Sequence, residues 1–246
     1  MNRDQLARAC QIATKDMRTY YLKAPLVSWG LLFPAAMILA FYLRGPSDIR
    51  MVIPGLVAMT VLFGATSVEG VVIAFEKRIG AMERLVMAPV SNAALLVGKS
   101  ASGAVFGTAT GALVWLVAGL ALDLPLAPMG LLVIAVGSIT FSLMGVLTAL
   151  VVREVFDAMA VSNAFRLPMT FLCGVFAPIA SMAPALQIVA SILPLTYTVD
   201  ALRHLELGGS GAQYALWVDL TVGIVYAVLL YVACYRLMQQ RLEELL

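Results

Sequence analysis

Residues 124–152 read LPLAPMGLLVIAVGSITFSLMGVLTALVV and contain no Asp, Glu, Lys or Arg. Five further stretches are also largely apolar and contain at most two charged residues each: 25–43, 51–75, 100–122, 167–199 and 214–237. About 20 apolar residues in a helix are enough to cross a hydrocarbon layer of ~30 Å. Lipid offers the backbone no hydrogen-bond partners, so such segments are expected to be helices. The sequence therefore predicts an all-α polytopic membrane protein.

The composition supports this class. Hydrophobic residues make up 62% of the 246 residues and charged residues 12%, with a mean hydropathy of +0.96. Soluble domains carry about 25% charged residues, so this chain lacks the polar surface to cover itself in water. No polar stretch is long enough for a separate soluble domain, and a net charge of +2 does not favour nucleic acid as a partner.

Catalytic, cofactor and metal chemistry find no support in the sequence. The three cysteines form no CxxC pair and are interpreted as small buried hydrophobic residues. The segment ending in Gly98-Lys99-Ser100 resembles the end of a phosphate-binding loop, but Ala93 stands where that loop needs a glycine. We expect Lys99 to lie at the cytoplasmic edge of a span, with its ammonium in water. With one histidine and no buried acidic pair, the chain is not expected to be an enzyme.

The basic residues predict the orientation. Thirteen of the 16 Lys and Arg residues can be assigned to one side of the membrane, and only Arg44, Arg50 and Arg203 to the other. In this assignment Arg153 and Arg166 both lie on the first side. Basic residues in short loops stay cytoplasmic. The split predicts six spans with both termini in the cytoplasm of a cytoplasmic-membrane protein.

The expected domains are a cytoplasmic amphipathic helix at 1–24 and a transmembrane domain at 25–246. Within 1–24, the apolar positions recur at steps of three and four residues: Leu6, Cys10, Ala13, Met17, Tyr20 and Ala24. This stripe predicts a helix that lies on the cytoplasmic membrane surface. The six spans are expected at about 25–43, 51–75, 94–122, 129–152, 160–178 and 214–237.

The region between the second and third spans, at 76–92, predicts a short amphipathic helix. Its charges alternate with Ile79, Met82, Leu85 and Val86. We call residues 76–92 the connector. The third span then carries Gly103, Gly107 and Gly111, a GxxxGxxxG face that allows another helix to approach closely.

The uncharged stretch 167–199 is too long for one span and is interrupted by prolines, which break helices. We expect the fifth span to end near Pro178. Short, partly inserted external helices are expected to follow near 181–193 and 195–205, with Pro184, Pro194 and Tyr197 among them.

Glu69 is the one carboxylate well inside a predicted span. Ionisable groups at such depth usually face a polar cavity or a partner. It therefore either lines a pathway or gate, or forms a structural hydrogen bond to a neighbouring span, through Thr66 or Ser67. A third alternative is simple exposure at the membrane interface.

Two segments resemble the permease subunit of type-2 ABC exporters. The first is FEKRIGAMERLVMAPVSNAALLVGK at 75–99, and the second is FLCGVFAPIASMAPALQIVASILPLTYTVDALRHL at 171–205. Their order and spacing match that family over essentially the whole chain. One departure is Gly80-Ala81-Met82-Glu83, where Gly-Thr-Leu-Glu is commoner in the family.

The resemblance implies that the connector is a coupling helix which inserts into a separate cytoplasmic ATPase, with the 1–24 helix bracing that contact. The implied coupling residues are Glu76, Lys77, Arg78, Met82, Glu83, Arg84 and Leu85. Two copies of the chain would line one pathway, with the glycine face offering close packing, and two copies of the ATPase would bind ATP-Mg. The resemblance makes Pro178, Pro184, Pro194 and Tyr197 gate candidates, and Glu69 is a pathway or gate candidate from its own position.

The substrate stays open among lipids, drugs and lipid-linked glycans, because short external loops suit all three. A passive channel or a membrane scaffold without an ATPase is the competing class. A secondary transporter is a third alternative, disfavoured because no inverted repeat of broken helices is evident.

Overall fold

The computed structural model describes residues 2–22, 35–41, 43, 46–67, 69–81, 85, 87–152 and 154–243. Most of the first predicted span, at 25–43, lies outside these residues, as do Met82, Glu83 and Arg84 of the connector. The described part of the chain contains helices and no strand. This confirms the predicted all-α class.

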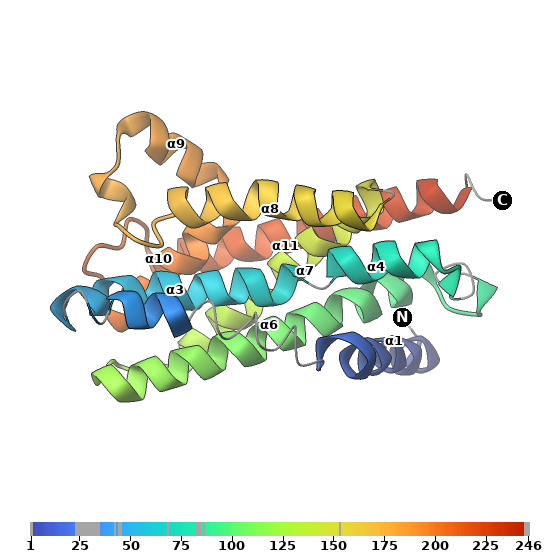
Figure 1. The fold of residues 1–246 in the computed structure, drawn as a ribbon, viewed down its shortest axis with the longest axis horizontal. Helices are drawn as coiled ribbons and strands as arrows, with labels where there is room; N and C mark the ends of the chain where they lie inside the picture. The colour runs from blue at the N-terminus through green and yellow to red at the C-terminus, as the bar shows by residue number, and fades with distance from the viewer. Residues whose placement is uncertain are drawn as a thin grey trace.

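The helices follow one another as α1 (Arg3–Asp16), η1 (Met17–Tyr21), α3 (Pro46–Thr66), α4 (Glu69–Arg78), α6 (Asn92–Leu122), α7 (Pro128–Val151), α8 (Val155–Leu172), η2 (Ile179–Ser181), α9 (Pro184–Ile192), α10 (Pro194–Glu206) and α11 (Leu216–Glu243). The long helices run side by side along the longest axis of the molecule (Figure 1). Helix α1 lies beside one end of α6, and α9 lies at the opposite end of the bundle. The chain's N-terminus and the last turns of α11 are at the α1 end.

Four helical segments of the described chain are long and apolar enough to cross a membrane: Ile49–Arg78, Asn92–Leu122, Pro128–Val151 and Leu216–Gln240. A fifth is obtained if α9 and α10, which meet at a bend of 98°, count as one broken span. Helices α6 and α7 begin and end within two residues of the third and fourth predicted spans. The structure thus supports a multi-pass membrane protein.

The fifth predicted span differs from the structure. Helix α8 begins at Val155 and ends at Leu172, and Gly174 follows with φ +80°, a conformation that favours glycine. The helix therefore ends before Pro178, and it is not among the four long apolar segments. Arg166, which the charge distribution assigned to the cytoplasmic side, lies inside α8.

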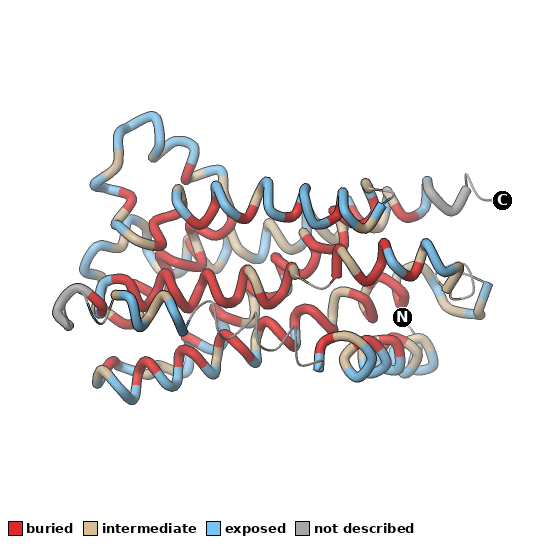
Figure 2. The backbone as a smooth tube through the Cα atoms, in the orientation of Figure 1, coloured by how far each residue is buried: buried red, intermediate tan, exposed pale blue. Residues whose placement is uncertain are grey.

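Helix α3 forms the centre of the bundle, and Figure 2 shows it buried along most of its length. Its apolar side chains pack with those of α6, α7 and α10 in the largest hydrophobic cluster. The three glycines of α6 face it. A Cβ atom on Gly107 would lie 2.8 Å from the Cβ of Ala65, and one on Gly111 would lie 2.4 Å from Cγ2 of Val61. The glycine face is thus covered by α3 of the same chain, and the expectation that it serves packing in a homodimer is corrected.

The three cysteines differ in their burial. Cys173 and Cys234 are buried as predicted, whereas Cys10 is exposed on α1. The reason is that the face of α1 that packs against the protein is formed by Ala9, Ile12 and Asp16. A Cβ atom on Gly98 of α6 would lie 2.9 Å from the Cβ of Ile12.

Replacing Gly55 with Ala is expected to destabilise the fold by at least about 1–3 kcal/mol, the usual cost of overpacking a core. Its Cβ atom would lie 2.1 Å from the carbonyl oxygen of Val175, and backbone cannot move aside as a side chain can. Thermal unfolding in detergent micelles measures the loss. The matched control is Gly223→Ala in α11, whose Cβ would meet only Cγ1 of Val136, at 3.2 Å. Equal stability of the two variants would contradict the packing described for α3.

Candidate functional site

A buried ionic cluster joins the N-terminal helix, the start of the connector and α6. We call Lys15, Asp16, Glu76 and Lys99 the ionic cluster. Nζ of Lys99 lies 2.7 Å from Oδ2 of Asp16 and also pairs with Oε2 of Glu76. Nζ of Lys15 lies 3.0 Å from Oδ1 of Asp16 and pairs with Oε1 of Glu76. Two ammoniums and two carboxylates thus alternate in a closed ring.

Burial makes these pairs structurally important. Asp16 and Glu76 are 0% exposed and Lys99 is 1% exposed. Only the Lys15 side chain, at 41%, keeps substantial access to water. Burial acts to lower the pKa of Lys15, but its hydrogen bonds to Glu76 and Asp16 and their negative charges outweigh burial, so the pKa is raised. An isolated buried charge is costly, and the ring leaves none isolated.

A second buried hydrogen-bond centre lies next to the ionic cluster, at Glu69. Helix α3 ends at Thr66, and α4 begins at Glu69. Oε1 of Glu69 accepts hydrogen bonds from the Tyr21 hydroxyl (2.8 Å), the Ser102 hydroxyl (2.8 Å) and the Gly103 amide (3.1 Å). Burial, and then the adjacent Glu69 carboxylate, raise the pKa of the Tyr21 phenol well above its usual value. Tyr21 therefore acts as a donor here.

This geometry favours the structural interpretation of Glu69. The carboxylate is 1% exposed and contacts η1 and α6. The suggested partners Thr66 and Ser67 instead donate to their own helix, at the carbonyls of Leu62 and Phe63. Gly103 is needed beside this contact, because its Cβ would lie 2.8 Å from the Ala65 carbonyl oxygen and 3.0 Å from Cγ of Glu69.

The N-terminal helix also holds the far end of the connector. The Gln5 side-chain amide donates to the Pro89 carbonyl (3.3 Å), and its oxygen accepts from the Ser91 amide (2.9 Å). Ser91 in turn caps α6, since its Oγ accepts from the Ala94 amide. The segment α1–η1, which we call the leader, thus contacts the connector both at Glu76 and at residues 89–91.

The predicted coupling residues are not all open to a partner. Glu76 is enclosed in the ionic cluster, and Lys77 donates to the Ala149 carbonyl (2.5 Å). Arg78 is exposed, and Leu85 is half-buried against a second hydrophobic cluster. The placement corrects two expectations. Glu76 offers no free carboxylate, because two ammoniums already neutralise it, and Lys99 is enclosed rather than in water.

The gate candidates other than Glu69 lie in or next to η2, α9 and α10, at the end of the bundle opposite to α1 (Figure 1). Pro184 and Pro194 are the first residues of α9 and α10, where a proline loses no helical hydrogen bond. Pro178 immediately precedes η2. The two short helices are those expected near 181–193 and 195–205.

Hydroxyl groups hold the bend between these two helices. The last carbonyls of α9 have no partner within the helix. That of Ala190 accepts from Thr196 (2.6 Å), that of Ser191 from Tyr197 (2.6 Å), and that of Ile192 from Tyr226 of α11 (2.5 Å). Tyr197 therefore fixes the bend, with its ring stacked on that of Tyr214 at 5.6 Å.

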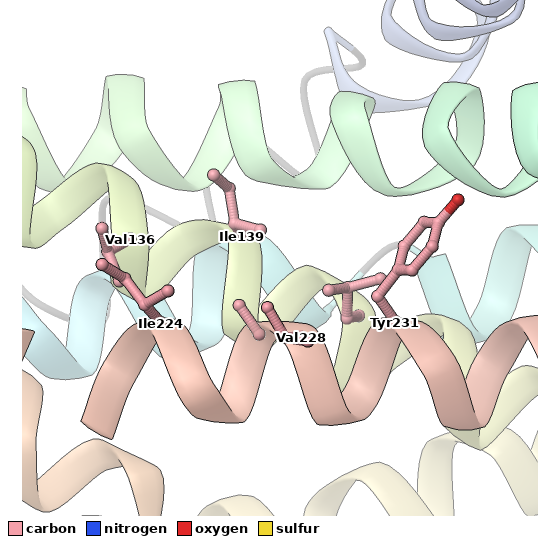
Figure 3. Close-up of a pocket in the computed structure, with 7 residues that line it drawn as sticks. Val136, Ile139, Ile224, Val228 and Tyr231 are labelled. Carbon is pink, nitrogen blue, oxygen red and sulfur yellow. The ribbon is translucent and has the colours of Figure 1, made fainter. Parts of the chain in front are cut away.

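An apolar groove of about 300 Å³ lies between α7 and α11. Its lining residues are Val136, Ile139, Leu143, Ile224, Ala227, Val228 and Tyr231. Figure 3 shows the labelled aliphatic side chains of the two helices facing one another, while the Tyr231 hydroxyl points away from them. The groove thus presents no charged group to a ligand.

The sequence predicted that the 1–24 helix braces the connector, but not which leader residues make the contacts: Gln5, Lys15, Asp16 and Tyr21. The contact of Ser102 was not predicted either. One available signal was that Glu69 and Lys99 each occur in or beside an apolar span, where an ionisable group needs a partner.

Comparison with known proteins adds to this geometry. The model of a family described as ABC-2 type transporter matches residues 8–207. The chain is 26% identical over 210 residues to the inner membrane transport permease YadH of Escherichia coli K12. The aligned region covers 80% of this chain and 77% of that protein. It is 26% identical over 188 residues to the putative transport permease ycf38 of Cyanophora paradoxa, covering 73% and 63% respectively. A shorter match, 39% over 75 residues, covers 30% of this chain and 28% of nodulation protein J of Bradyrhizobium diazoefficiens.

Proposed function

Because the chain belongs to the ABC-2 type transporter family, we propose that it is the membrane-spanning permease subunit of an ATP-driven exporter. It would move a lipid, a drug or a lipid-linked glycan outward. The pathway is formed by two copies of the chain, and two copies of a separate ATPase subunit bind and hydrolyse ATP.

The observation that carries this proposal is the attachment of the leader to both ends of the connector. A cytoplasmic partner that pushes on the connector also pushes on Glu76. That residue is paired with Lys99 of α6 inside a ring of buried charges. Separating such a pair costs several kcal/mol, so the push moves the leader and α6 rather than breaking the contact. A passive channel or scaffold has no use for such an arrangement.

We assign the polar contacts with the ATPase to Glu83 and Arg84. Glu76 does not contact the ATPase; it transmits the movement of the connector to α6 through its buried pair with Lys99. ATP binding closes the paired ATPases and biases the permease between inward- and outward-facing states. The bias equals the difference in the ATPase's affinity for those two states. The bend held by Tyr197 at the far end of the bundle serves as the external gate.

Co-purification tests the partner. An ATPase subunit is expected to remain bound to the tagged chain through affinity and size-exclusion steps in mild detergent. A chain that purifies without ATPase and still transports substrate would reject the proposal in favour of a channel or a secondary transporter.

The proposed topology has both termini in the cytoplasm. In a Cys10→Ser background, Met87→Cys in the connector should react with a membrane-impermeant thiol reagent only after the cells are opened. Ser210→Cys should react in intact cells. Both positions are exposed, with Met87 at 86%, so reaction reports the side of the membrane rather than burial. Labelling of Met87→Cys in intact cells would reverse the orientation.

A further inference from the structure

Arg166 is a buried cation without an ionic partner in the part of the chain that the structure describes. It is 7% exposed, and its guanidinium carbon lies 5.5 Å from the centre of the Phe63 ring of α3. The four described ion pairs involve only the ionic cluster. Its Nε atom is fully enclosed and donates to no group.

The position of Arg166 along α8 makes this unusual. It lies eleven residues after the first residue of the helix, or about 16 Å at 1.5 Å per residue, in a helix about 27 Å long. Helix α8 runs beside α3 and α4 (Figure 1). The guanidinium lies over Phe63, which is near the middle of the candidate span Ile49–Arg78. A cation at such depth is costly and is generally found beside a partner.

The neighbouring helices do not supply that partner. Of the carboxylates on α4, Glu69 accepts from η1 and α6 through Oε1, and its enclosed Oε2 has no hydrogen-bond partner in the described chain. Glu76 belongs to the ionic cluster, and neither carboxylate forms an ion pair with Arg166 in the described chain. Asp157 lies nine residues earlier on α8, and the apolar helices α7 and α9 contain no acidic residue.

The buried carboxylates of a second copy of the chain would not supply the partner either. The carboxylates that the structure places within the bundle are enclosed: Glu69, Asp200, Glu206 and Asp219 are each at most 4% exposed.

The tip of the Arg166 side chain is its accessible part. Nε is enclosed, but the two Nη atoms are not among the enclosed unpaired atoms, and they make no hydrogen bond within the described chain. The Nη groups are therefore not fully enclosed, and the Phe63 ring packs against the guanidinium. A guanidinium presented in this way suits two parallel hydrogen bonds to a phosphate.

We propose that Arg166 binds the phosphate group of the amphiphile that the chain transports, while that group crosses the membrane. This rests on the proposed export function and narrows its substrate class to phosphate-bearing amphiphiles. Headgroups of resting lipids lie at the edges of the ~30 Å hydrocarbon layer. Only an amphiphile in transit brings its phosphate to the depth of Arg166.

The test measures the binding of dodecyl phosphate to the purified full chain by native mass spectrometry. Dodecyl maltoside serves as the neutral comparison. Arg166→Gln is expected to weaken dodecyl phosphate binding about tenfold, equal to ~1.4 kcal/mol. Arg166→Lys should keep most of the affinity because it keeps the charge. Arg236→Gln, a cation removed from α11, should leave binding unchanged, and no variant should alter maltoside binding.

Several results would overturn the proposal. The first is wild-type affinity in Arg166→Gln. The second is a pattern in which Arg166→Met keeps wild-type affinity and thermal stability while Arg166→Lys loses both, which would make the arginine a packing residue. The third is phosphatidylglycerol that stays bound through delipidation and is not displaced by dodecyl phosphate, which would identify a resident lipid. Binding needs no ATPase, so failure of ATPase co-purification and failure of this assay are separate outcomes.

Discussion

Replacing Lys99 with Met is expected to destabilise the chain by ~3–5 kcal/mol, the usual cost of removing one partner from a buried ion pair. The change leaves the carboxylates of Asp16 and Glu76, both 0% exposed, with only Lys15 to neutralise them. Thermal unfolding of the purified chain in detergent measures the loss. Proteolysis within residues 3–16 should also become faster, because the leader loses its ionic contact with α6.

Lys15→Met provides the matched control, since it removes the same charge from the same ring. Its side chain is 41% exposed, so water can reach the site, and Glu76 keeps its pair with Lys99. The loss should therefore be clearly smaller. Adding Asp16→Asn to Lys99→Met should recover part of the stability by removing an uncompensated carboxylate. Equal losses for Lys99→Met and Lys15→Met, or no recovery in the double variant, would contradict the ionic cluster.

Exchanging the charges of Glu83 and Arg84, as Glu83→Arg with Arg84→Glu, is expected to abolish ATP-driven transport and leave the membrane domain folded. Truncating one partner of a desolvated charge pair costs ~2–5 kcal/mol at an interface, whereas a solvated surface pair contributes ~0–1 kcal/mol. The measurements are ATPase association, ATP hydrolysis by the reconstituted complex, and thermal unfolding of the chain.

Arg78, which is exposed at the end of α4, offers a comparison within the same segment. Arg78→Gln removes one charge without reversing the pattern, so it should weaken the complex less. If the exchanged variant keeps wild-type ATPase association and hydrolysis, these charges only keep a cytoplasmic segment in water. The coupling assignment would then be dropped.

The sequence predicted the helices where their cause is local. Runs without charge, such as 129–152, can only be helical in lipid, and α7 spans Pro128–Val151. Pro184 and Pro194 predicted the two short helices because proline is favoured in the first turn and excluded from the interior. The early end of α8 was less predictable, since Pro168 lies within that helix.

The ionic cluster could not be predicted in the same way, because its members come from distant parts of the chain. Asp16 is 60 residues from Glu76, and Glu76 is 23 residues from Lys99. Each was interpreted by its own surroundings: Lys99 as a cation at the membrane edge, and Glu76 as a contact to a partner. Only tertiary packing reveals that they neutralise one another.

We propose that the leader and the connector move as one body when the ATPase acts. A Cys10→Ser chain carrying Gln5→Cys and Ser91→Cys allows a direct test, because the Gln5 side chain contacts the Ser91 amide at 2.9 Å. A short thiol-reactive linker that reductant removes would join the two segments. The measurement is ATP-driven transport by the reconstituted complex before linking, after linking and after reduction. If the leader and the connector move together, the transport rate is the same in all three states. A transport rate that falls on linking and recovers on reduction would show that the two segments must separate, and would contradict movement as one body.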